Sequence, residues 1–156
     1  TEDLMLAELT RPDLGYVGEV FAVRDVYLKK LLADNIIPVI SSVAPSEDGD
    51  LINVNADLAA SSIASALEAT ELVIFTDVAG LYQNWPDPDS LVHSITSSDL
   101  EELLPSLQSG MIPKVEACLA AIHGGVKVAR MIDGSKAGSL GMLGRSEGNL
   151  GTKVVG

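Results

Sequence analysis

The sequence predicts an α/β fold in which helices cover both faces of one mostly parallel central sheet, a three-layer αβα sandwich. Short apolar runs rich in β-branched residues alternate along the chain with longer stretches whose apolar residues recur every three or four positions. The composition agrees, because 47% of the 156 residues are apolar and only 4% are aromatic. Residues 1–156 are therefore expected to form part of one domain whose core consists of Val, Ile, Leu and Ala.

The first half of the chain shows five elements in order. They are a helix, a buried strand, a turn, a short strand and an alanine-rich helix, expected at residues 26–34, 36–41, 45–50, from 51 and 58–67. The first helix would place Leu28, Leu31 and Leu32 on one side. Pro38 limits the first strand to a strand start or a sheet edge, since proline donates no backbone hydrogen bond.

The second half shows six elements. They are a buried strand, an irregular stretch, a capped helix, an amphipathic helix and two strands, expected at residues 73–77, 83–93, 98–104, 115–122, 127–131 and 152–155. Ser98 and Glu101 have the spacing of a capping box, and Pro113 suits the first turn of the amphipathic helix. The irregular stretch, which contains Trp85, is either a lid over a ligand or a surface loop.

A first cluster of polar side chains lies where a short strand meets the alanine-rich helix. Asn53 and Asn55 are two positions apart, so in an extended chain both point to one face, and Asp57 follows where the helix begins. Paired amides can hold a ligand that carries carboxylate and amide groups, and the acid can position a cation. Asn and Asp also cap helices and form turns, so a purely structural role remains open.

Two further segments point to an anionic ligand. Thr76 and Asp77 end a buried strand, and in open α/β sheets ligands bind beyond the carboxyl ends of strands. Gly110 precedes the helix that starts near Pro113, where free N–H groups and the helix dipole attract anions. Lys114 would add a full positive charge within the first turn of that helix. Each of these residues also has an ordinary structural reading, as a strand end or a solvated lysine.

The three segments together resemble the acetylglutamate kinases, members of the amino acid kinase family. The matching stretches are residues 53–57, 76–82 and 109–117, in the family's order and spacing. The Asn-x-Asn-x-Asp string separates this group from uridylate kinase and aspartokinase, and Leu81-Tyr82 with Trp85-Pro86-Asp87 looks most like actinobacterial members. The resemblance implies the amino acid kinase fold.

The implied reaction transfers the γ-phosphoryl group of ATP to the side-chain carboxylate of N-acetyl-L-glutamate, in arginine biosynthesis. Lys114 would stabilise the transferring group, Asp57 would orient catalytic lysines, and Asn53 with Asn55 would hold the acetylglutamate. The nucleotide would contact Thr76, Asp77, Gly80, Leu81, Tyr82, Ser109, Gly110 and Met111. Mg²⁺ would be held mainly by the nucleotide phosphates rather than by a protein metal site. Neither a protein nucleophile nor a general base is needed, because the acceptor carboxylate is already ionised at neutral pH.

Two alternatives stay open: a related kinase for an aminoadipate-type acceptor, and a non-catalytic nucleotide-binding module. The family carries a glycine-flanked lysine, a glycine-rich loop and a carboxylate-binding arginine upstream of the matched segments, and none of them is found here. The chain thus resembles the C-terminal, nucleotide-binding half of such a kinase. We expect these 156 residues alone to bind nucleotide weakly and to show no turnover. Gly138 and Leu143-Gly144-Arg145 replace the residues of arginine-regulated members, so arginine inhibition is not expected.

Charge and cysteine content bound the remaining properties. The net charge of −12 disfavours binding to nucleic acid and to anionic membranes. Cys118, the one cysteine, lies on the apolar face of its helix, so a core thiol and a reducing compartment are expected. The expected location is the cytoplasm, and the expected assembly is a homo-oligomer. His93 and His123 fall outside the matched motifs and are expected on the surface.

Overall fold

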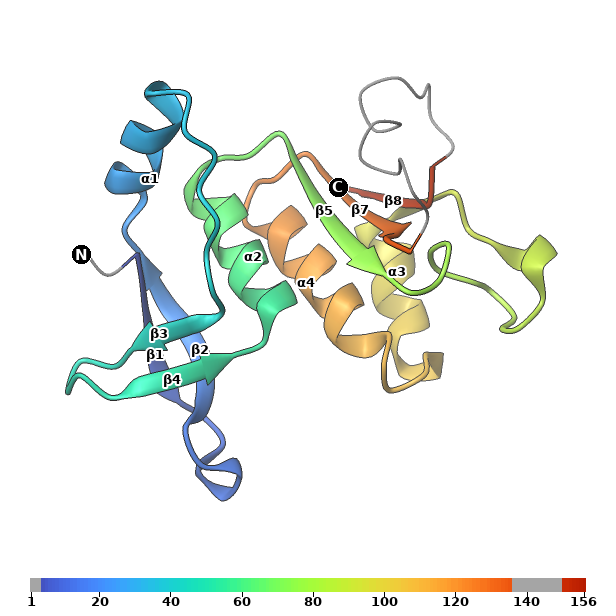
Figure 1. Ribbon diagram of the computed structural model, residues 1–156. Helices are drawn as coiled ribbons and strands as arrows, with labels where there is room; N and C mark the ends of the chain where they lie inside the picture. Colours follow the sequence, from blue (N-terminus) through green and yellow to red (C-terminus); the bar gives the residue numbers. More distant parts are fainter. Residues whose placement is uncertain (1–3, 136–149) are drawn as a thin grey trace.

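The computed structural model describes residues 4–135 and 150–156, and their strands form two four-stranded sheets. We call these sheet A, in the strand order β1-β2-β4-β3, and sheet B, in the order β5-β7-β8-β6. Helix α2 (Ala56–Ala66) stands between the two sheets, with α4 (Ile112–His123) beside it (Figure 1). The α/β class is confirmed.

Sheet A is built from the N-terminal part of the chain. Its strands are β1 (Met5–Leu9), β2 (Val17–Val23), β3 (Val43–Pro45) and β4 (Leu51–Val54). Helix α1 (Asp25–Ala33) follows β2. One face of sheet A buries a small cluster around Ile52 and Val54, and Ala59 of α2 closes it.

Sheet B and its helices hold the larger core. The strands are β5 (Glu71–Thr76), β6 (Ser94–Thr96), β7 (Val128–Asp133) and β8 (Thr152–Val155), and α3 (Ser97–Leu103) follows β6. Val115, Cys118 and Leu119 of α4 are buried, which confirms the predicted apolar face of this helix. Burial raises the pKa of the Cys118 thiol to about 12, so this cysteine is the inert core thiol that the sequence predicted.

The strand pairing differs from one mostly parallel sheet. Three pairs are parallel, namely β2 with β4, β5 with β7 and β6 with β8. The other three pairs are antiparallel. The short connection from β3 to β4 can join only antiparallel neighbours, whereas the helical connections allow parallel ones. A short apolar run such as residues 72–75 of β5 is predictable as a buried strand, but the strands that pair with it are not.

Residues 36–41, predicted as a buried strand, form neither a helix nor a strand. Ile37 is 87% exposed and Val39 is 97% exposed. Pro38 removes one donor, and within the described residues no strand lies alongside to pair with the segment. An apolar, β-branched run specifies an extended backbone, but a strand also requires a bonded neighbour.

The predicted helix boundaries and the predicted exposure of the two histidines can be compared directly with the structure. The predicted helices 26–34 and 58–67 correspond to α1 and α2, each shifted by one or two residues, and β8 has the predicted bounds. Helix α3 is capped by Thr96, which accepts from the N–H of Asp99 at 3.2 Å, rather than by Ser98. Both His93 and His123 are exposed, as predicted. Strands β1, β2, β3 and β6 were not predicted, because they are short or lack strict alternation.

No helix within residues 4–135 and 150–156 combines the length and apolar character needed to span a membrane. The sequence inferences about Gly138 and residues 143–145 lie outside the described residues.

Candidate active site

A pocket of about 480 Å³ opens at the carboxyl end of β5. Its walls come from three segments: the end of β5 with the loop that follows, the hairpin beyond that loop, and the start of α4. The lining residues are Thr76, Asp77, Val78, Leu81, Tyr82, Trp85, Leu107, Gln108, Gly110, Met111 and Lys114. Most of the sequence-predicted nucleotide residues are thus brought together, although they lie up to 35 positions apart in the chain.

The β5 end supplies the polar floor of the pocket. Thr76 is only 7% exposed, and its hydroxyl donates to Asp77 Oδ1 at 3.2 Å. The Thr76 carbonyl accepts from the N–H of Gly134, which follows the neighbouring parallel strand β7. This pairing fixes the point at which the chain leaves the sheet, so Asp77 is exposed at the pocket.

Gly80 lies behind the wall of the pocket rather than in its lining. A Cβ atom at position 80 would be 2.5 Å from Thr152 Oγ1, so glycine is needed for the close approach of this loop to β8. The Thr152 hydroxyl accepts from the N–H of Leu81 at 2.7 Å and donates to the Val92 carbonyl at 2.6 Å. Buried Thr152 therefore holds Leu81 in the pocket wall.

The start of α4 differs from the expected row of free N–H groups. The Met111 and Ile112 N–H groups donate to the Gln108 carbonyl, the Lys114 N–H donates to the Met111 carbonyl, and Pro113 has no N–H. A turn over 108–111 thus continues the helical winding and uses these donors. Gly110 lines the pocket with open space beside it, since an added Cβ would meet no atom within 4 Å. Ser109 is exposed and is not part of the lining.

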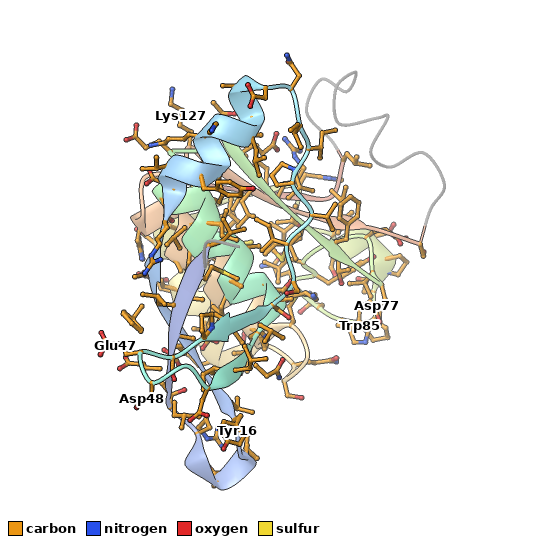
Figure 2. The ribbon with its side chains drawn as sticks, turned by 60° about the vertical axis from the view of Figure 1, so that its left-hand side comes forward. Tyr16, Glu47, Asp48, Asp77, Trp85 and Lys127 are labelled. Atoms are coloured by element: carbon orange, nitrogen blue, oxygen red, sulfur yellow. The ribbon has the colours of Figure 1, made fainter. Side chains whose placement is uncertain are left out.

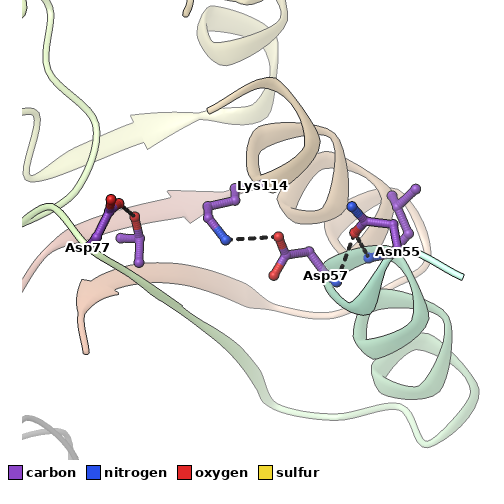
Figure 3. A network of polar contacts seen from close by, with 6 residues as sticks. Asn55, Asp57, Asp77 and Lys114 are labelled. Atoms are coloured by element: carbon purple, nitrogen blue, oxygen red, sulfur yellow. Dashed lines mark hydrogen bonds and ion pairs between the residues drawn. The ribbon is translucent and has the colours of Figure 1, made fainter. Parts of the chain in front are cut away.

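Lys114 points into the pocket and pairs with Asp57 of α2 (Figure 3). Its ammonium lies 2.9 Å from Asp57 Oδ2, and both side chains are 23% exposed. An ammonium has three N–H donors, of which Asp57 takes one, so the lysine is fixed in place while still able to donate to an anion in the pocket. The two residues are 57 positions apart in the chain.

The two asparagines behave differently from each other. The Asn55 side-chain oxygen accepts from the N–H groups of Asp57 and Leu58 at 2.9 and 3.2 Å, so Asn55 is the N-cap of α2. This bond links the helix start directly to the residue that holds Lys114 (Figure 3). Asn53 is exposed in β4. Neither asparagine lines the pocket that contains Lys114.

Trp85 is the lining residue whose role the sequence left open between lid and surface loop. It follows the glycine-containing loop by five positions and packs edge-on against Tyr82, with 5.1 Å between the ring centroids. Both rings line the pocket. The sequence feature that could have indicated a place in the pocket is a lone tryptophan in a proline-rich hairpin next to a matched motif.

Comparison with known proteins identifies the family. The model of the amino acid kinase family matches residues 2–133, which is most of the chain. The chain therefore belongs to the amino acid kinase family.

Curated relatives narrow the similarity. The chain is 50% identical to the acetylglutamate kinase of Corynebacterium urealyticum, in an alignment that covers 91% of this chain and 47% of that protein. It is 52% identical to the acetylglutamate kinase of Kineococcus radiotolerans, covering 92% of this chain and 50% of that protein. The chain thus spans about half the length of the curated relatives it matches. The predicted resemblance to actinobacterial acetylglutamate kinases is confirmed.

Solved structures share the fold. N-acetylglutamate synthase from Neisseria gonorrhoeae, complexed with coenzyme A and N-acetyl-glutamate, superposes with a TM-score of 0.89 at 23% identity, covering 99% of this chain and 37% of that one. Carbamate kinase from Giardia superposes with a TM-score of 0.69 at 24% identity, covering 89% of this chain and 51% of that one. The amino acid kinase fold is confirmed.

Proposed function

We propose that this chain supplies the nucleotide-binding and phosphoryl-stabilising part of an acetylglutamate kinase. The reaction transfers the γ-phosphoryl group of ATP to the side-chain carboxylate of N-acetyl-L-glutamate and yields N-acetyl-L-glutamyl 5-phosphate. The observation that carries the proposal is the Lys114 ammonium, held 2.9 Å from Asp57 Oδ2 at the pocket beyond β5. The named relatives at about half sequence identity support the acceptor.

Lys114 acts on the charge that develops during transfer. Phosphoryl transfer spreads negative charge over the equatorial oxygens, and it needs positioned cations more than covalent chemistry. Asp57 positions Lys114, since a lysine without a partner would sample many rotamers and would have to be ordered during the reaction. Asp57 does not itself contact the reacting atoms, so it is a positioning residue in this proposal.

The nucleotide occupies the pocket that contains Thr76, Asp77 and Gly110. The open space beside Gly110 leaves room for a phosphate next to Lys114. In this proposal Mg²⁺ enters with ATP and is held mainly by the nucleotide phosphates. The acceptor would sit near Asn53, and Asn55 would act through its cap of α2.

Calorimetry with Mg-ATP tests the nucleotide site, because ATP carries the γ-phosphoryl group that Lys114 is proposed to contact and ADP does not. Lys114→Met should weaken binding at least about tenfold, because a hydrogen bond to a charged group contributes about 1.5–3 kcal/mol. Lys29→Met is the matched control, since Lys29 pairs with Asp25 on α1 and does not line the pocket. Equal affinities of the Lys114 variant, the Lys29 variant and the unchanged chain would refute the proposed site.

A non-catalytic nucleotide-binding module is the second candidate. The observation that favours it is that neither Asn53 nor Asn55, the residues expected to hold the acceptor, lines the pocket. Titration of Mg-ADP with and without N-acetyl-L-glutamate separates the two. A kinase couples the two ligands, so the acetylglutamate should change the ADP affinity, whereas the module should bind ADP with the same affinity in both titrations. An aminoadipate derivative in place of acetylglutamate tests the related kinase.

A further inference from the structure

A half-exposed aromatic side chain stands at the pocket without a role in the proposed reaction. Trp85 is 50% exposed, although tryptophan is among the most favourable side chains to bury. It lies on the same side of the molecule as Asp77, well away from Tyr16 (Figure 2). Of the large apolar side chains that are exposed among the described residues, Trp85 is the one that also lines this pocket.

The hairpin that carries Trp85 is internally bonded. Tyr82 and Leu91 form a β-bridge at its base, and the Gln83 N–H donates to the Ser90 carbonyl. The Ser90 hydroxyl accepts from the Asn84 N–H at 3.1 Å and donates to the Asp87 carbonyl at 2.7 Å. These bonds, together with the Tyr82 ring 5.1 Å away, hold the indole in one place. A ring that is already fixed loses little conformational entropy when a ligand packs on it.

The pocket offers two kinds of chemistry. Lys114 and Thr76 provide a charged and a hydroxyl group, while Leu81, Tyr82 and Trp85 provide apolar and aromatic surface. A purine nucleotide has the same two parts, namely phosphates that pair with an ammonium and a flat base that stacks on an aromatic face. If Lys114 takes the phosphates, the base is left to the aromatic wall.

We propose that Trp85, held by Tyr82 and the bonded hairpin, forms the wall on which the base of the bound nucleotide stacks, and thereby determines the affinity for the base. The inference rests on the proposed nucleotide site and goes beyond it by assigning the base to a residue outside the matched motifs. When the base stacks on Trp85 it covers the exposed face of the indole. This burial adds binding free energy to that of the phosphate contacts.

Binding of ADP and of pyrophosphate to this chain tests the inference, with Trp85→Ala, Trp85→Phe and Tyr16→Ala as variants. Trp85→Ala should weaken ADP binding roughly fivefold to a hundredfold, the range that base stacking on an aromatic ring usually supplies. Trp85→Phe keeps a smaller ring and should lose only about two- to fivefold. Pyrophosphate has no base, so its affinity should be the same in all variants. Tyr16 is 60% exposed and lies outside the pocket, so Tyr16→Ala should bind ADP within about twofold of the unchanged chain.

The unchanged chain supplies a second readout that does not depend on how a variant folds. Trp85 is the single tryptophan of the sequence, so ADP should quench or shift the tryptophan fluorescence while pyrophosphate should leave it nearly unchanged. If Mg-ATP binding depends on Lys114 while ADP leaves the fluorescence unaltered and binds Trp85→Ala as tightly as the unchanged chain, the stacking role is overturned and the proposed function stands. Binding of neither ADP nor pyrophosphate at millimolar concentration overturns both. Emission that varies with protein concentration but not with ADP assigns Trp85 to contacts between chains and also overturns the inference.

Discussion

The two halves of the molecule bury their apolar side chains to very different extents. We call residues 4–54 the N-terminal region, and residues 55–135 with 150–156 the C-terminal region. The C-terminal core contains 15 buried apolar residues, whereas the cluster under sheet A contains six, one of which comes from α2. Of the 14 large apolar side chains that are exposed among the described residues, 12 lie in the N-terminal region.

This difference shows where the stability and the site are located. A dense core surrounds β5, β7 and α4, and these elements carry Thr76 and Lys114. In the N-terminal region, by contrast, leucines and isoleucines such as Leu32 and Ile37 satisfy the sequence pattern of a core without being buried. The apolar pattern of a segment therefore predicts its potential to be buried, and the packing of the other elements decides whether it is.

The largest expected effect contrasts the two clusters. Met131 and Ile52 are both 0% exposed, in the C-terminal core and in the sheet A cluster respectively. Met131→Ala should cost about 2–5 kcal/mol of unfolding free energy in urea, because a cavity in a dense core relaxes little. It should also speed hydrogen exchange throughout the chain.

Ile52→Ala should fall at the lower end of that range, because the smaller cluster can collapse onto the space. Its effect on exchange should be confined to β1 to β4 and the adjoining face of α2. If Ile52→Ala also accelerated hydrogen exchange throughout the chain, the two regions would unfold as one unit and the comparison between them would fail.

The second effect concerns the ion pair within the C-terminal region. Asp57→Ala leaves the Lys114 ammonium partly buried without its partner, so we expect a loss of about 1.5–3 kcal/mol. Denaturant unfolding measures it. Adding Lys114→Met to Asp57→Ala should recover part of the loss, since the unpaired charge is then gone. Additive losses in the double variant would mean that the 2.9 Å contact contributes no coupling.

The third effect uses the buried thiol of the C-terminal core. Burial raises the pKa of Cys118 from 9.0 to about 12, so the folded protein retains this proton after the unfolded chain has lost it. The stabilisation is complete below pH 9.0 and is lost as the pH rises toward about 12. At about pH 10 the loss should reach roughly 1.4 kcal/mol.

Cys118→Ala removes this titration, so it serves as the matched control for the other alkaline groups. Urea midpoints measured at neutral pH and near pH 10 should fall more for the unchanged chain than for the variant. Parallel decreases would place the thiol in contact with solvent and contradict its burial.

The smallest effect lies at the junction of the two regions. Asn55→Ala should cost about 1 kcal/mol, because the side chain caps α2 through two N–H groups. Asn53→Ala, two positions earlier on exposed β4, should change the unfolding free energy by less than about 0.5 kcal/mol. Thermal unfolding of the Asn55→Ala and Asn53→Ala variants measures both losses. A larger loss at Asn53 would reverse the assignment of the cap.

Agreement between sequence and structure follows the range of the interactions involved. Helices α2 and α4, the β5 strand and the buried face of Cys118 were predictable, because periodicity and local propensity act over a few neighbouring residues. The capping residue of α3 was not, because Thr96 and Ser98 both have an acidic residue three positions later. The segment 36–41 was not predictable either, since nothing in its own sequence reports whether a neighbouring strand is present.

The sequence by itself determined the family and the segments that carry polar side chains. Through the family resemblance it also predicted that Asp57 orients catalytic lysines. Only the tertiary structure decided that Asp57 Oδ2 lies 2.9 Å from the Lys114 ammonium, that the Asn55 side-chain oxygen caps α2 and that Trp85 lines the pocket. The physical reason is that residue type and spacing fix what a segment can form, whereas contacts over 57 positions depend on how every intervening element packs.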